Sequence, residues 1–215
     1  MNKVKLYLVF AIVFSCSSFL WAADSWPNWR GPEFTGVAPG CNPPTVWSET
    51  QNIKWKVKLT GDGSDGSPVV WNDKIFFQTA IKTDKSVAVA PDDLPLMTAA
   101  EMAPPPEGRQ GQRRGGGMNM ETPKNIYQFN LVCMDRATGK ILWEKTACEA
   151  MPHQGHHPDH GYASFSPVTD GKYVWAYFGS QGIYCYDFNG KQIWKKDLIQ
   201  MKTRFGEGSS PAIAG

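Results

Sequence analysis

Residues 184–198, YCYDFNGKQIWKKDL, repeat the pattern of residues 132–146, VCMDRATGKILWEKT. Each copy places Cys-x-Asp before a Gly-Lys pair and a Trp, and the second copy is one residue shorter in the turn. The matching positions are Asp135 and Asp187, Gly139 and Gly190, and Trp143 and Trp194. A repeat of this length indicates an architecture built from repeated units.

Four short strands are predicted around the second copy. The stretch FSPVTDGKYVWAYFGSQGIYCYD, residues 165–187, alternates apolar and polar residues and is divided by Asp-Gly and Gly-Ser-Gln-Gly turns. Such period-2 runs, rich in Val, Tyr and Phe, are strand and hairpin signals. The first copy begins alike, with GSPVVWNDKIFFQTA at 66–80, and a third start, SSPAIAG, occupies 209–215.

These units predict an all-β chain and, more finely, a β-propeller of four-stranded blades. Within residues 24–215, blade one is predicted at 66–147 with an insertion at 82–124, blade two at 163–198, and the start of blade three at 209–215. In each motif the Asp is expected to accept turn N–H groups, the Gly to adopt positive φ, and the Trp to cover the neighbouring blade.

The stretch CMDRATGKILW at 133–143 resembles the tryptophan-docking motif of the pyrroloquinoline-quinone-type propeller repeats. Quinoprotein alcohol dehydrogenases carry such repeats, as does the propeller lipoprotein of the outer-membrane β-barrel assembly machinery. WPNWRGPEFTGV at 26–37 resembles the start of exported bacterial proteins with these repeats. The resemblance implies seven or eight blades, of which this chain would hold the N-terminal two to three. It also implies that Trp55 lies on an outermost strand that completes the last blade.

Export is predicted from the N-terminus. Residues 1–23 combine Lys3 and Lys5 with an apolar run and small residues, the layout of a signal peptide. An uncleaved anchor and lipid attachment at Cys16 are the alternatives. The mature chain is then expected in the periplasm, at the outer membrane or outside the cell, without a transmembrane domain. Beyond Lys5, 20 basic residues face 20 acidic ones, so charge gives no reason to expect nucleic acid as a partner.

Loops on one face of the predicted propeller are the candidate binding site. All four histidines of the chain lie in the loop between blades one and two: His153, His156, His157 and His160. Arg204 and Glu207 precede blade three, on the same predicted face. A solvated loop is favoured for the histidines, with a metal site at His156, His157 and His160 as the weaker candidate. The Pro-, Gly- and Met-rich insertion is predicted to be mostly disordered.

The favoured function is a non-catalytic exported scaffold that binds a protein or an envelope component and needs no cofactor. The alternative is a quinone-dependent alcohol or sugar dehydrogenase, and that resemblance would bring pyrroloquinoline quinone with calcium. It would also require two adjacent cysteines, which the sequence lacks. Cys133 and Cys185 are predicted to be small buried strand residues, whereas pairing of Cys41 with Cys148 remains open.

Overall fold

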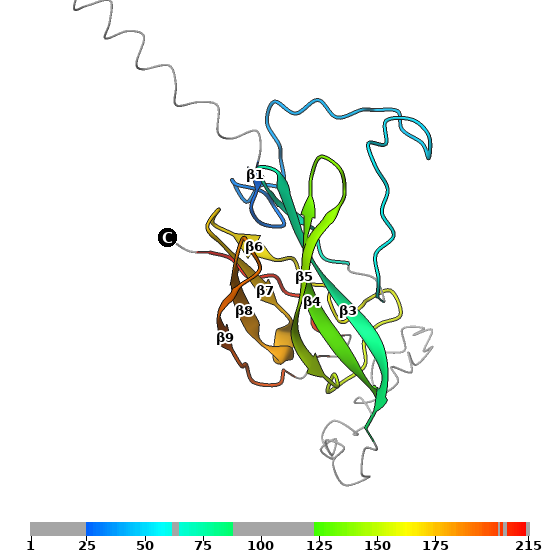
Figure 1. The fold of residues 1–215 in the computed structure, drawn as a ribbon, viewed down its shortest axis with the longest axis vertical. Helices are drawn as coiled ribbons and strands as arrows, with labels where there is room; N and C mark the ends of the chain where they lie inside the picture. The colour runs from blue at the N-terminus through cyan, green and yellow to red at the C-terminus, as the bar shows by residue number, and fades with distance from the viewer. Residues whose placement is uncertain (1–24, 62–64, 88–122, 202, 204–205, 214–215) are drawn as a thin grey trace, which may run out of the picture.

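The computed structural model describes residues 25–61, 65–87, 123–201, 203 and 206–213 (Figure 1). The predicted signal peptide, the central part of the insertion and Arg204 lie outside the described residues. The described part of the chain folds into two antiparallel β-sheets of five and four strands, and neither sheet closes on itself. The prediction of an all-β chain is therefore confirmed.

The strands follow one another across each sheet in chain order. The first sheet has the order β1 (Ser25–Trp26), β2 (Val69–Trp71), β3 (Lys74–Ser86), β4 (Asn125–Asp135) and β5 (Ile141–Ala150). The second has the order β6 (Val168–Thr169), β7 (Tyr173–Tyr177), β8 (Ile183–Asp187) and β9 (Gln192–Lys196), with a 3-10 turn, η2 (Gly179–Gln181), between β7 and β8. In each sheet the chain therefore passes from strand to neighbouring strand in sequence order, beginning at a two-residue edge strand, the inner edge of the sheet.

The insertion begins later than the sequence predicts. The sequence predicts that residues 82–86 belong to it, but they continue β3, with Lys82 opposite Tyr127 and Ser86 opposite Asn125. Strands β3 and β4 are 13 and 11 residues long, whereas β7 and β8 have five residues each, so the first sheet extends past the second (Figure 1). Four of residues 82–86 are exposed and Thr83 is half-buried, so this end of the hairpin needs no apolar face and its sequence resembles a polar loop.

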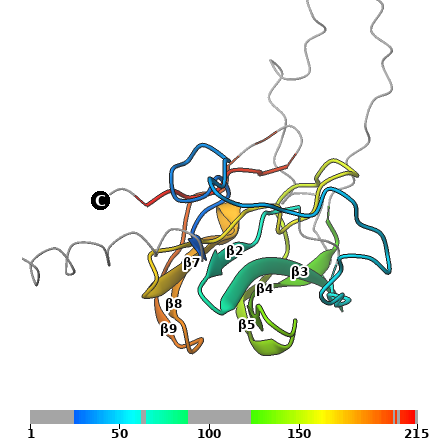
Figure 2. The same cartoon turned by 90° about the horizontal axis from the view of Figure 1, so that it is seen from above.

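The core lies between the two sheets, which pack face to face (Figure 2). Alternate residues of β3 and β4 face the second sheet, and alternate residues of β7 and β8 face back. Phe129 and Phe178 meet edge to face with ring centroids 5.4 Å apart. Cys133 and Cys185 are 0% and 1% exposed, which confirms that both are small buried strand residues.

A two-residue strand that the repeat pattern does not predict ties the sheets together at their inner edge. β1 pairs with β2, with Ser25 opposite Trp71, and so adds a fifth strand to the first sheet. Just after β1, the carbonyl oxygen of Pro27 accepts a 2.9 Å hydrogen bond from the Thr169 N–H of the second sheet. The N-terminal segment thus holds both inner edges in place.

Candidate functional site

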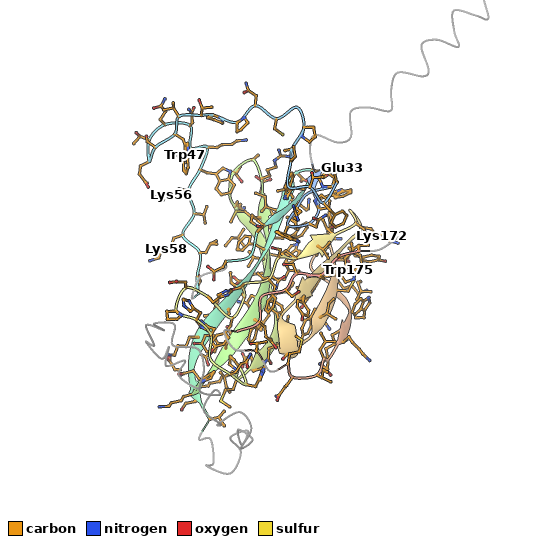
Figure 3. All side chains as sticks on the ribbon, turned by 180° about the vertical axis from the view of Figure 1, so that it is seen from behind. Glu33, Trp47, Lys56, Lys58, Lys172 and Trp175 are labelled. Carbon is orange, nitrogen blue, oxygen red and sulfur yellow. The ribbon has the colours of Figure 1, made fainter. Side chains whose placement is uncertain are left out.

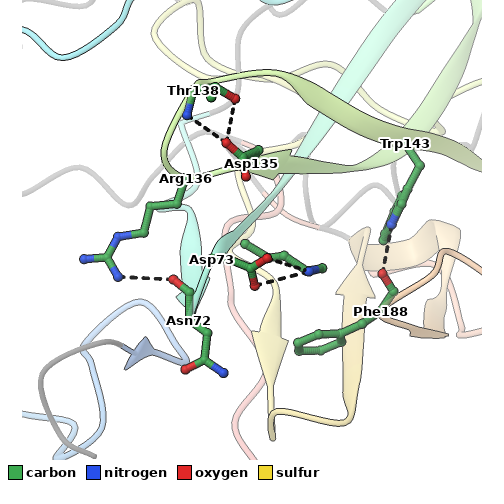
Figure 4. Close-up of polar contacts among 8 residues, drawn as sticks. Asn72, Asp73, Asp135, Arg136, Thr138, Trp143 and Phe188 are labelled. Atoms are coloured by element: carbon green, nitrogen blue, oxygen red, sulfur yellow. Dashed lines mark hydrogen bonds and ion pairs between the residues drawn. The ribbon is translucent and has the colours of Figure 1, made fainter.

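In both repeated turns the motif Asp accepts hydrogen bonds from the turn, through different partners. The Asp135 carboxylate accepts bonds from the Thr138 N–H at 2.8 Å and from its hydroxyl at 2.5 Å (Figure 4). These bonds, led by the hydroxyl, lower the pKa of Asp135. Asp187 accepts from two turn N–H groups, each at 2.9 Å. Gly139 and Gly190 have φ of 73° and 80°, a conformation that strains any residue with a Cβ.

Each turn also receives a tryptophan from another part of the chain. The Trp55 indole N–H donates to the carbonyl oxygen of Arg136 at 3.0 Å, and a Cβ on Gly139 would lie 2.7 Å from that ring. The Trp143 indole N–H donates to the carbonyl oxygen of Phe188, also at 3.0 Å (Figure 4). A Cβ at the equivalent glycine of the second turn would lie 3.0 Å from the Trp143 ring.

These two contacts correspond residue by residue. Arg136 and Phe188 each follow the motif Asp directly, and in both cases the indole lies over the motif glycine. Trp143 also packs against Phe76, at 5.9 Å between ring centroids. Trp194 occupies the third equivalent position, but it is 42% exposed and packs on no turn within the described residues.

The starts of the three repeat units are linked by serines at the inner edge. The Ser67 N–H donates to the Ser166 hydroxyl oxygen at 2.8 Å, and the Ser166 N–H donates to the Ser210 hydroxyl oxygen at 3.0 Å. The strands approach closely here, because a Cβ on Gly66 would lie 2.1 Å from the carbonyl oxygen of Phe165. The serine N–H of each Ser-Pro start therefore bonds the serine hydroxyl of the next start. The sequence pattern alone does not predict this contact.

The loops leading to β2, to β6 and to residue 210 meet at one end of the sheets. The Ser164 hydroxyl donates to the Asp65 carboxylate at 3.0 Å, which joins the first two loops. The second and third are joined by His153, whose Nε2 lies 2.8 Å from the carbonyl oxygen of Met201. The described residues of the predicted binding face, namely the four histidines and Glu207, thus lie where three loops are packed together.

Glu207 is more firmly held than a solvated loop residue. One of its carboxylate oxygens accepts from the Ser180 N–H at 2.8 Å, and the other bonds the Ser180 hydroxyl. That hydroxyl oxygen also accepts from the Met201 N–H at 2.8 Å. Burial raises the pKa of the neighbouring Tyr177, and the Glu207 charge adds to this. Sequence reasoning missed Ser180, because a serine in a Gly-Ser-Gln-Gly turn gives no signal of a distant partner.

The four histidines make separate contacts instead of converging. The His156 ring meets Tyr162 edge to face at 4.4 Å between centroids, and its Nδ1 lies 2.7 Å from the His157 carbonyl oxygen. His157 Nδ1 accepts from the Asp159 N–H, and His160 Nδ1 lies 3.2 Å from the Ser164 hydroxyl. Within the described ranges no three His, Cys, Asp or Glu side chains are placed to hold a metal ion. The candidate set His156, His157 and His160 is therefore not assembled.

A small cavity lies between the His loop and Glu207. It encloses about 30 Å³ and is lined by His153, His156, Tyr162 and Glu207, with Phe129 and Phe178 at its base. Such a volume accommodates one or two water molecules. Among the groups that line it, His153 and Glu207 make hydrogen bonds to other parts of the chain.

The four cysteines in the described part of the chain form no disulfide. Cys41 is exposed and Cys148 is half-buried, and both are free thiols. Burial raises the pKa of Cys133 to about 12 and that of Cys185 to about 11. These thiols stay protonated at neutral pH and are unreactive.

No helix in the described segments is long and apolar enough to cross a bilayer. Comparison of the chain with protein-family models and with curated proteins finds no match.

Proposed function

We propose that the two sheets are successive blades of an exported β-propeller, and that the protein is a non-catalytic scaffold for a protein or cell-envelope component. One observation carries this proposal: a tryptophan docks in the same way on two successive turns. Trp55 and Trp143 each donate to the carbonyl oxygen that follows the motif Asp, and each covers the motif Gly.

Trp143 joins the first sheet to the second, and the Trp55 contact offers the same atoms for a preceding unit to join the first sheet, so one rotation and translation would serve both contacts. When such a step is applied again it generates a ring or a helical array. The serine bonds at the inner edge, from Ser67 to Ser166 and from Ser166 to Ser210, repeat at the same step. Agreement between the outer and inner contacts supports a radial arrangement of blades around an axis.

The scaffold role is supported by the contacts that hold the loops at one end of the sheets. His153 bonds a carbonyl oxygen of the next loop, and the Glu207 carboxylate is engaged by Ser180. These groups act to position the loops relative to the sheets. Loops held on a rigid framework present a binding surface at low entropic cost. Export is supported by the signal-like composition of residues 1–23.

Cosedimentation of the purified mature protein with isolated cell envelopes tests this function. Saturable binding that survives PQQ and calcium depletion is expected. His157→Ala should weaken it with little change in melting temperature, because that side chain is 27% exposed and bonds the Asp159 N–H within its own loop. Loss of envelope binding after depletion would count against the scaffold. Alcohol-dependent dye reduction in the presence of quinone and calcium would establish the dehydrogenase instead.

A further inference from the structure

The turn between β8 and β9 contains the only Asn-Gly pair of the sequence, Asn189 and Gly190. The Asn189 N–H donates to the Asp187 carboxylate at 2.9 Å, but its side chain is exposed and its amide makes no hydrogen bond within the described part of the chain. A free side-chain amide is open to attack by the backbone nitrogen of the following residue. Glycine offers that nitrogen without a Cβ to shield it.

Each of the other asparagines is followed by a residue that carries a side chain. Asn28 is in addition 3% exposed, and both ends of its side-chain amide are hydrogen-bonded. Asn72 is the closest comparison, because it is exposed in the turn between β2 and β3. The residue after it is Asp73, whose side chain shields the backbone nitrogen. Asn189 therefore differs from an equally exposed asparagine by its glycine neighbour.

The Gly190 nitrogen is held by its own turn and by a tryptophan of the first sheet. The Gly190 N–H donates to the Asp187 carbonyl oxygen at 3.0 Å, which closes the turn and withholds the nitrogen from attack. The Trp143 indole bonds the Phe188 carbonyl oxygen in this turn (Figure 4), and its ring lies close against Gly190. A turn fixed at these points opens less often than a free one. Docking of the first sheet therefore controls access to a reactive nitrogen in the second.

We propose that Asn189 is a site of spontaneous deamidation whose rate is set by the docking of Trp143. When the turn opens, the Gly190 nitrogen attacks the side-chain carbonyl carbon of Asn189. The new C–N bond closes a succinimide ring, and the side-chain nitrogen leaves as ammonia with the proton of the Gly190 N–H. Water, the only other reactant, then opens the ring: hydrolysis at the side-chain carbonyl yields aspartate, and hydrolysis at the backbone carbonyl yields isoaspartate.

The products weaken the contact that slows their formation. Isoaspartate adds one methylene group to the backbone before Gly190, which shifts this glycine away from the docked indole. Both products also place a second carboxylate in the turn that already holds Asp187, and like charges at short range repel. The first turn is protected from this change, since Thr138 precedes Gly139 there. The two tryptophan contacts therefore differ in chemical lifetime, although they use the same atoms.

Mass spectrometry of the purified mature chain, held folded at mildly alkaline pH, tests the proposal. Trypsin cleaves after Lys172 and Lys191, which are both exposed, and releases residues 173–191 with Asn189 as the only asparagine. Figure 3 shows Lys172 on the second sheet with Trp175. The mass of this peptide should increase with time, and labelling by an isoaspartyl methyltransferase should identify isoaspartate. The peptide that contains Asn72 should keep its mass.

Substitutions at the docked tryptophan test the control of the rate. Trp143→Ala should accelerate the conversion about fivefold or more, because a hydrogen bond that holds the turn is lost. Trp143→Phe keeps a ring but no donor, so it should change the rate in the same direction with less damage to the fold. Trp194→Ala is the matched control, because Trp194 is 42% exposed and packs on no turn within the described residues. It should leave the rate unchanged.

Asn189→Thr places before Gly190 the residue type that precedes Gly139. This variant should show no conversion, and its melting temperature should stay constant on incubation while that of the wild-type chain falls. Absence of conversion in the folded wild-type chain would overturn the proposal, as would equal rates in the wild-type chain and both Trp143 variants. Equal conversion at Asn72 would show that the glycine does not select the site. An unchanged melting temperature after complete conversion would contradict the predicted weakening of the contact.

Discussion

Replacing Trp143 by Ala should lower the free energy of unfolding by about 3 kcal/mol. Truncation of a buried tryptophan costs roughly 3 to 5 kcal/mol, and the lower end applies because Trp143 is only partly buried. About 1 kcal/mol of this is the indole hydrogen bond to Phe188. For a chain of this size the melting temperature should fall by about 6 to 12 °C.

A second substitution at the same position separates packing from the hydrogen bond. Trp143→Phe keeps an aromatic ring beside Phe76 but removes the N–H donor, so it should cost about 1 to 2 kcal/mol. Trp194→Ala is the matched control at the equivalent repeat position. Because Trp194 is 42% exposed, its removal from this chain should cost less than about 1 kcal/mol.

Urea unfolding followed by far-ultraviolet circular dichroism is the appropriate assay, because the substitutions change tryptophan fluorescence directly. The expected order of destabilisation is Trp143→Ala, then Trp143→Phe, then Trp194→Ala. Equal effects of the two alanine variants would refute the argument that docking on the next turn stabilises the pair of sheets. A loss below about 1 kcal/mol for Trp143→Ala would have the same consequence.

Gly190→Ala should cost about 2 kcal/mol, because φ is 80° and a Cβ would lie 3.0 Å from the docked indole. Gly40→Ala, at φ 75° with no atom within 4 Å, should cost only the backbone term of about 1 kcal/mol, and thermal melts that fail to separate the two would contradict this. Ser166→Ala should remove the acceptor of the Ser67 N–H, and faster hydrogen exchange at the Ser67 amide is the measurement. Ellman's reagent at pH 8 should modify Cys41 promptly and Cys133 only after unfolding; rapid reaction of both would show that the strand thiol is accessible.

Much of the local structure follows from the sequence. Period-2 patterns predict the strands, and Asp135 and Gly139 predict the turn. Side-chain hydrogen bonding in a turn and positive φ are properties of a few consecutive residues. The end of β3 could not be predicted in this way. Its last five residues are all polar, and only Thr83 among them is half-buried, so the apolar alternation that identifies a half-buried strand is absent there.

Less of the candidate site could be predicted from the sequence. The histidine positions are evident in the chain, but their partners are not, because Met201 and Ser164 come from loops whose relative placement depends on sheet packing. Glu207 was identified as a loop acid, whereas its bond to Ser180 spans 27 residues. Nothing in a short motif encodes a contact of that separation.

The sequence by itself determined the repeat, the strands and the turn chemistry, because these depend on interactions within about ten residues of chain. Only the tertiary structure decided which tryptophan is docked and which is exposed. Trp143 and Trp194 occupy equivalent positions, yet Trp143 lies against the second sheet while Trp194 remains 42% exposed. Burial is a property of what surrounds a side chain in space, so identical local motifs can carry different energies.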